Sequence, residues 1–150
     1  MDLRDRRPVI GRREIADFPE LDIVGLPVKI DTGAYNSSFH CEHYRLKPDG
    51  LLEVVFLDPE HTNFTGKVHK FSDFRKKTVK SSNGQAELRF MISTTISFAG
   101  NEFEIDVSLA KRGDMRFTVL VGRKFLKSYR FLVDPLKKEL LSPRKMKRKR

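Results

Sequence analysis

The sequence of 150 residues is poor in sulfur and has no long apolar segment. Cys41 is its single cysteine, so no disulfide can form within the chain. No apolar run approaches the roughly 20 residues that a membrane-spanning helix needs. The first residues alternate in charge and do not form the apolar stretch of a secretory signal. These absences predict a cytoplasmic, soluble protein that does not contact a membrane.

The sequence also lacks the usual motifs of nucleotide and metal chemistry. It contains no Gly-x-x-x-x-Gly-Lys-Ser/Thr loop, no His-Glu-x-x-His and no Cys-x-x-Cys. The candidate metal ligands are His40, Cys41, Glu42, His43, His61 and His69. Because this region resembles a strand, His40 and His43 are expected to point in opposite directions. We therefore predict no metal and no cofactor, and zinc catalysis is the minor alternative.

Positive charge is concentrated at the C-terminal end. The formal net charge is +10, and six positive charges lie in residues 144–150, which leaves +4 for the remainder. Such a tail can bind nucleic acid, ribosomes or acidic lipid by releasing counterions. A solvated terminus is the more common explanation of a charge run. We therefore expect nucleic-acid binding only as non-specific contact by this tail.

Turn residues spread through the chain indicate one domain built from short strands. There are 7 prolines and 9 glycines, and the length suits a single core. We assign residues 1–8 to an N-terminal tail, 9–142 to the domain and 143–150 to the basic tail. Apolar runs and turn signals predict an all-β, closed, mostly antiparallel barrel with one short helix after Gly122. The expected strands are 9–15, 26–30, 44–46, 51–57, a hairpin over 79–91, 102–107, 117–121 and 129–133.

A candidate catalytic carboxylate lies at the end of an apolar strand. Residues 28–30 run directly into Asp31, Thr32, Gly33 and Ala34. Neighbouring backbone N–H groups keep such an aspartate ionised, and Gly33 allows close approach of a second backbone or a substrate. Thr32 offers a hydroxyl that braces the loop. The same tripeptide is also typical of an Asx turn at a strand end, so its surroundings must decide.

The second half of the chain supplies those surroundings. Val121, Gly122 and Arg123 resemble the apolar-Gly-Arg element that lies beneath the catalytic loop in retropepsins, and the two motifs occur in that family's order. The hairpin between them lies where retropepsins carry the flap that folds over the substrate. The resemblance implies that Asp31 activates water and that Val121–Arg123 support its loop. The substrate contacts that it implies are Ala34 and the flap-tip residues Ser81, Ser82, Asn83 and Gly84.

The resemblance extends to a small bacterial family named for ATP-dependent zinc proteases. It is carried by residues 10–14, 29–34, 81–84, 106–112 and 121–123. Members are considered retropepsin-like in fold and often accompany ATP-grasp enzymes that add glutamate to ribosomal protein. The resemblance therefore implies an ATP-grasp enzyme or a ribosomal protein as partner.

The same resemblance implies a homodimer. Aspartic proteases use two carboxylates that share one proton to activate water. This chain has one Asp-Thr-Gly, so Asp31 of a second copy is required, with the site on a two-fold axis. Asp106 is the alternative carboxylate within the chain, although a strand residue that faces outward is the simpler interpretation.

One departure from the viral pattern limits what can be transferred. Viral retropepsins carry acidic residues after the alanine, which pair with the arginine of the Gly-Arg element, but here Tyr35 and Asn36 follow. The partner of Arg123, the substrate and the cleavage preference therefore stay open.

Two other function classes compete with an endopeptidase. The first is a catalytically silent peptide- or protein-binding module on the same fold. The second is a basic nucleic-acid-binding barrel that uses residues 75–77 and Lys80. Phe71 and Phe74 would stack on bases in such a barrel, but core packing explains them more simply.

Overall fold

The computed structural model describes residues 7–80, 83–111 and 116–141. Most of the N-terminal tail, the basic tail, Ser81 and Ser82 lie outside these residues. The described elements are β1 (Val9–Gly11), β2 (Arg13–Phe18), the 3-10 turn η2 (Pro19–Leu21), β3 (Ile23–Ile30), β4 (Ser37–Leu46), β5 (Leu52–Phe56), β6 (His69–Phe71), β7 (Arg75–Lys80), β8 (Ala86–Phe98), β9 (Asn101–Ala110), β10 (Val119–Val121), α1 (Arg123–Ser128) and β11 (Leu132–Asp134).

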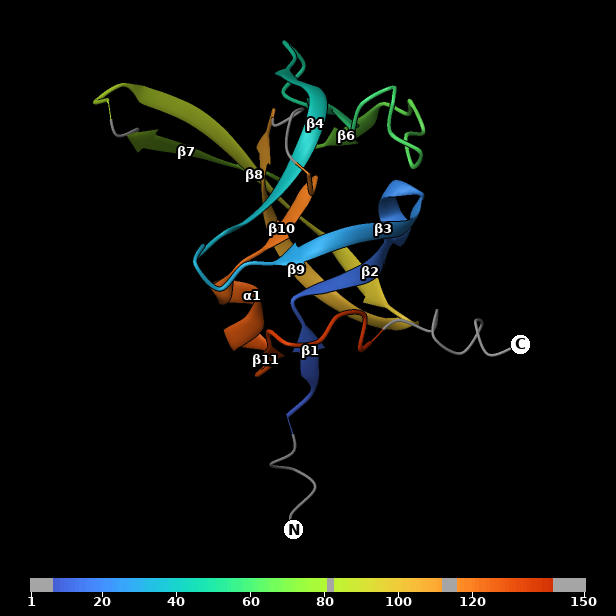
Figure 1. The fold of residues 1–150 in the computed structure, drawn as a ribbon. Coiled ribbons are helices and arrows are strands. Elements are labelled where there is room, and N and C mark those ends of the chain that lie inside the picture. Colours follow the sequence, from blue (N-terminus) through green and yellow to red (C-terminus); the bar gives the residue numbers. More distant parts are fainter. Residues whose placement is uncertain (1–6, 81–82, 112–115, 142–150) are drawn as a thin grey trace.

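Six strands close into a barrel, which confirms the predicted fold class. The order is β10-β3-β2-β8-β9-β4, and β4 pairs back onto β10. The β10–β3 and β4–β9 pairings are parallel, and the other pairings of the ring are antiparallel. Strands β5 and β6 extend the sheet beyond β4, and the β7–β8 hairpin projects away from the barrel (Figure 1).

Alternation of side chains along the strands explains which residues fill the interior of the barrel. In β2, buried residues alternate with half-buried ones, because successive side chains point to opposite faces of a strand. Edge-to-face contacts join Phe39 to Phe18 and Phe56, with ring centroids 4.9 and 4.8 Å apart. Phe71 and Phe74 pack against the core, as the simpler interpretation predicted. No helix among the described residues is long and apolar enough to cross a membrane.

Aromatic packing also fixes α1, the one α-helix of the described chain. Phe103 on β9 contacts Phe125 of α1, Tyr129 and Phe131, with ring centroids 4.8–5.9 Å apart. The Tyr129 hydroxyl donates to the Glu104 carbonyl and accepts from the Glu104 N–H. The helix is therefore held against β9, directly after the Gly122-Arg123 motif.

The two predicted hairpins are present. Lys47 N–H donates to the Leu51 carbonyl between β4 and β5, and Gly50 has a φ of 89°. At the β7–β8 turn Gly84 has a φ of 86°, and the Asn83 side chain accepts from Gln85 N–H. Glycine suits both positions because a positive φ costs it little.

The predicted first strand, residues 9–15, is wrong as one element. The chain bends at Arg12, so that β1 pairs with β11 in a separate two-stranded sheet while β2 joins the barrel. The bend is imposed by a distant segment: Arg12 N–H donates to the Lys137 carbonyl, and a Cβ at Gly11 would lie 2.7 Å from that same oxygen. The last strand likewise begins at Leu132, after a turn in which Arg130 has a φ of 59°.

A buried carboxylate locks the C-terminal segment onto this bend. Glu14 has no exposed surface. Its Oε2 accepts from Gly11 N–H and Leu140 N–H, both at 2.9 Å, and its Oε1 accepts from Leu141 N–H at 3.0 Å. Three charge-assisted bonds compensate for burying the charge. Residues 10–14, which carry part of the family resemblance, therefore have a structural role in this clamp.

We expect Glu14→Gln to lower the free energy of unfolding by about 2–3 kcal/mol. The amide keeps the size but removes the charge and points a donor at backbone N–H groups, and bonds to charged groups are worth about 1.5–3 kcal/mol each. Urea denaturation measures the change, with Glu102→Gln on exposed surface as the control. Equal midpoints for Glu14→Gln and wild type would contradict the clamp.

Candidate functional site

The Asp31 loop leaves the barrel where β3 ends, as predicted. Asp31 N–H donates to the Val121 carbonyl at 2.8 Å, so the loop begins hydrogen-bonded to β10. Gly33 N–H donates to Asp31 Oδ1 at 3.0 Å, and Ala34 N–H donates to the Asp31 carbonyl at 3.3 Å. Asp31 is half-buried, while Thr32 and Gly33 are exposed. The Asx turn is thus present, and the carboxylate remains at the surface of a well-held loop.

Gly122 and Arg123, which the resemblance assigns to support of the loop, both contact residues that follow Asp31. Gly122 N–H donates to Ser37 Oγ, and Arg123 N–H donates to the Ala34 carbonyl. A Cβ at position 122 would lie 2.6 Å from the carbonyl oxygens of Tyr35 and Asn36. Real Cβ atoms do not approach backbone this closely, so only glycine fits the loop against β10.

Arg123 has found partners different from the acidic ones of viral retropepsins. Its Nη1 donates to the Thr32 carbonyl at 3.0 Å, and its guanidinium lies over the Tyr35 ring, 5.8 Å from the centroid. A cation above an aromatic face and a backbone acceptor are both favourable for arginine. Tyr35 therefore takes the place that an acidic side chain would fill.

A groove joins the loop to the base of the flap-like hairpin. Its cavity of about 200 Å³ is lined from the loop side and β4, from β9 and β10, and from β7 and β8. The lining residues are Ala34, Asn36, Ser37, Ser38, Lys77, Arg89, Met91, Ser108 and Leu120. Of the predicted substrate contacts, Ala34 lines the groove. Asn83 and Gly84 lie at the hairpin tip and do not, and Ser81 and Ser82 are outside the described residues.

Sequence reasoning missed the two cations of the groove. Lys77 and Arg89 lie opposite each other across the β7–β8 pair. Their partnership depends on the hairpin register, which the turn at Asn83 and Gly84 sets. Counting outward from that turn would have paired them.

Two of the candidate metal ligands, His40 and Cys41, are buried in β4. His40 is buried in β4, with its Nε2 2.8 Å from Asp58 Oδ2. Burial also raises the pKa of the Cys41 thiol, which disfavours the thiolate that would bind a metal. Among the described residues, no three His, Cys, Asp or Glu side chains are grouped as metal ligands.

Asp106, the alternative carboxylate, contacts two cations. Its Oδ2 lies 3.3 Å from Arg75 Nη2 and 3.2 Å from Lys124 Nζ, and its Oδ1 accepts from Ser93 Oγ at 2.6 Å. Burial is the largest single influence on the pKa of Asp106, and it opposes ionisation. The hydrogen bonds from Ser93 and Lys124 and the charges of Arg75 and Lys124 together outweigh it, so the pKa of Asp106 is lower than usual.

We expect Gly122→Ala to destabilise the protein by about 1–3 kcal/mol, the usual cost of overpacking a rigid site. The new methyl group would push the loop away from β10. Gly25→Ala is the control, since its Cβ would meet open space and only its φ of 72° opposes alanine. Thermal unfolding measures both. A smaller loss for Gly122→Ala than for Gly25→Ala would refute the close approach.

Proteins named glutamate ligase resemble this chain in sequence. The chain is 30% identical over 146 residues to a protein named probable alpha-L-glutamate ligase from Shewanella pealeana, and 30% identical over 132 residues to one of the same name from Desulfotalea psychrophila. These alignments cover 89% and 86% of this chain but 30% and 28% of the relatives. The chain therefore spans less than a third of their length.

A solved structure and a family description complete the comparison. A Legionella pneumophila protein of unknown function superposes with a TM-score of 0.64 at 21% identity, covering 91% of this chain and all of that one. This likeness supports the fold. The family described as retropepsin-like aspartic endopeptidase RimB matches residues 9–144, which include the Asp31 loop, the hairpin and the Gly122-Arg123 element. The chain belongs to this RimB-like family, as its motifs predicted.

Proposed function

We propose that the protein is a homodimeric aspartic endopeptidase in which Asp31 activates water. The observation that carries this proposal is the loop itself. Asp31 stands half-buried at the end of β3, with its backbone bonded to Val121 and its loop held against Gly122. The groove lined by Ala34, in the same loop as Asp31, provides room for a substrate side chain.

The chemistry requires two such carboxylates. Two carboxylates a few ångströms apart cannot both ionise cheaply, so they hold one proton between them. The ionised member takes a proton from water as the oxygen attacks the peptide carbonyl, and the protonated member donates to the carbonyl oxygen. One chain supplies one Asp-Thr-Gly, so a second copy must supply the other aspartate.

The surface near the loop is suited to a second copy. An apolar-rich hollow of about 410 Å³ adjoins Thr32 and is lined by Leu126, Phe131 and Val133 together with basic side chains. In the neighbouring two-stranded sheet, Val9 and Leu132 are 42% and 48% exposed. A second copy would cover these side chains and bring the two loops together on the axis.

The groove favours acidic substrate side chains. Lys77 and Arg89 line it from the hairpin, opposite the polar Ser37 and Ser38. Arg89 already pairs with Glu87 at 2.7 Å, so Lys77 is the cation at the groove wall that attracts carboxylates. A peptide with glutamate or aspartate near the cleaved bond is therefore the proposed substrate.

The names of the relatives favour a second candidate function, in which this protein works in association with a ligase. The matched segment forms part of proteins named glutamate ligase, and the ATP-grasp partner implied by the family resemblance is consistent with this. A catalytically silent module that binds a peptide for such a ligase would use the same groove without Asp31 chemistry. Loss of cleavage in an Asp31 variant separates the two functions.

We expect Asp31→Asn to abolish cleavage of an acidic peptide library, a loss of about 10²–10⁴-fold for a missing acid–base group. A mixture of the Asp31→Asn variant and wild type also tests whether two copies share one active site. Excess Asp31→Asn should suppress wild-type activity beyond dilution, because a mixed dimer has one carboxylate. Peptide cleavage from acidic to neutral pH is the measurement.

Two controls define this experiment. Excess Glu102→Gln, an exposed change, should leave wild-type activity intact. A chelator should also have no effect. Equal cleavage by Asp31→Asn and wild type, or loss of activity with chelator alone, would reject the aspartyl mechanism, and purely additive activity in the mixture would reject the shared site.

We expect Lys77→Glu to raise KM for glutamate-containing peptides about fivefold relative to glutamine-containing ones, as expected when a screened ion pair becomes a repulsion. Lys76→Glu is the matched control, because it changes the same charge on the same strand but does not line the groove. Steady-state kinetics on paired peptides measure the ratio. An identical ratio for the two variants would contradict the acidic preference.

A further inference from the structure

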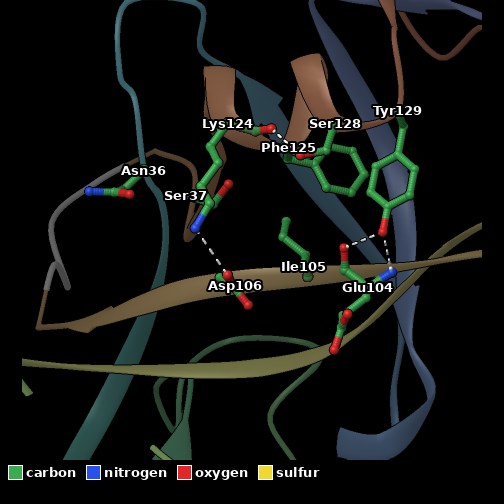
Figure 2. A pocket seen from close by; sticks show the side chains of 9 residues that line it. All are labelled: Asn36, Ser37, Glu104, Ile105, Asp106, Lys124, Phe125, Ser128 and Tyr129. Atoms are coloured by element: carbon green, nitrogen blue, oxygen red, sulfur yellow. Dashed lines mark hydrogen bonds and ion pairs between the residues drawn. The ribbon is translucent and has the colours of Figure 1, made fainter. Parts of the chain in front are cut away.

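One carboxylate on β9 contacts side chains from three other elements. Asp106 meets Arg75 from β7, Ser93 from β8 and Lys124 from α1. Its contact with Lys124 is visible beneath the helix in Figure 2. The Asp106 side chain is only 24% exposed, whereas the side chains of Arg75 and Lys124 are 55% and 46% exposed. Water therefore screens the charge of Asp106 less than the charges of its partners.

The cluster holds two like charges near one anion. Without the Asp106 charge, Arg75 and Lys124 would each lose a hydrogen-bonded or ion-pair partner and would repel one another. The hydrogen bond from Ser93 orients the carboxylate between them. The lowered pKa of Asp106 keeps it ionised at moderately acidic pH, where a carboxylate pair sharing one proton works. The link therefore persists under the conditions of the proposed reaction.

Each of the two cations belongs to an element that holds, or forms, one side of the groove. Lys124 belongs to the helix start that holds the loop, because Lys124 N–H donates to the Tyr35 carbonyl at 3.0 Å and Arg123 N–H donates to the Ala34 carbonyl at 2.8 Å. Arg75 opens β7, two residues before Lys77, which lines the groove. Asp106 therefore joins the base of the hairpin to the element that holds the Asp31 loop.

We infer that Asp106 is a positioning residue that sets the hairpin base against the catalytic loop before substrate binds. The inference rests on the proposed protease function for the role of the groove. Holding the two walls in place lowers the entropy cost of ordering the hairpin over a peptide. Asp106 thus acts on substrate binding through Arg75 and Lys124, and not on the bond-breaking step at Asp31.

Asp106→Asn tests this role because it removes the charge and keeps the size. We expect amide hydrogen exchange at residues 76–78 and 34–36 to accelerate about fivefold, as for loss of a partly screened ion-pair link. KM for the peptide should rise by a similar factor, with kcat within about twofold of wild type, because the interaction contributes to binding alone. Asp106→Glu should restore part of the exchange protection.

Controls separate positioning from general stability. Glu102→Gln removes an exposed carboxylate from the same strand and should change neither exchange nor KM. If Asp106→Asn does not fold, Arg75→Gln breaks the hairpin side of the link, and the same local acceleration at 76–78 is expected.

The outcomes are distinct. Unchanged exchange in both segments of a folded Asp106→Asn, or equal acceleration throughout the chain, would overturn the inference. A fall in kcat with unchanged KM would also overturn it. Because exchange is measured without turnover, a wild-type protein that cleaves nothing would reject the proposed function while the test of Asp106 still stands.

Discussion

The insertion of β10 between β3 and β4 is the constraint on which the rest of the structure depends. This three-residue strand pairs in parallel with β3 and antiparallel with β4, and so closes the barrel. The same strand receives the N–H of Asp31 and leads into Gly122, whose lack of a side chain lets the Tyr35 and Asn36 carbonyls approach. Barrel closure and loop geometry therefore come from one set of contacts, and a change that weakens one must disturb the other.

Two carboxylates outside the loop support this arrangement in different ways. Glu14 is fully buried and satisfied by three backbone N–H groups, so it joins segments that are distant in the sequence into one rigid end of the barrel. Asp106 is partly exposed and paired with the more exposed cationic side chains of Arg75 and Lys124. A buried charge with backbone partners favours rigidity, whereas a half-exposed ion pair permits a hinge to adjust. The hairpin base has the second kind of contact.

The functional proposals follow from charge and symmetry around this frame. In these proposals, the cationic side chains that line the groove select the substrate by charge, and the single Asp-Thr-Gly requires a second copy to complete the site. The chain belongs to the RimB-like family and resembles a segment of proteins named glutamate ligase, which leaves both the endopeptidase and the ligase-associated proposal to experiment. Substrate charge and the number of carboxylates are thus separate questions with separate experiments.

The sequence by itself determined the barrel class, the two hairpins, the short helix and the Asp31 and Gly122 motifs, because alternation, turn residues and glycine requirements are local. It did not determine that the first strand would break at Arg12, since the cause is the Lys137 carbonyl, more than 120 residues away. Nor did it assign Tyr35 to Arg123, or Arg75 and Lys124 to Asp106, because these partners meet only when strand register and helix placement are known. Tertiary structure decided them because side-chain electrostatics act across space, between residues that the linear pattern does not connect.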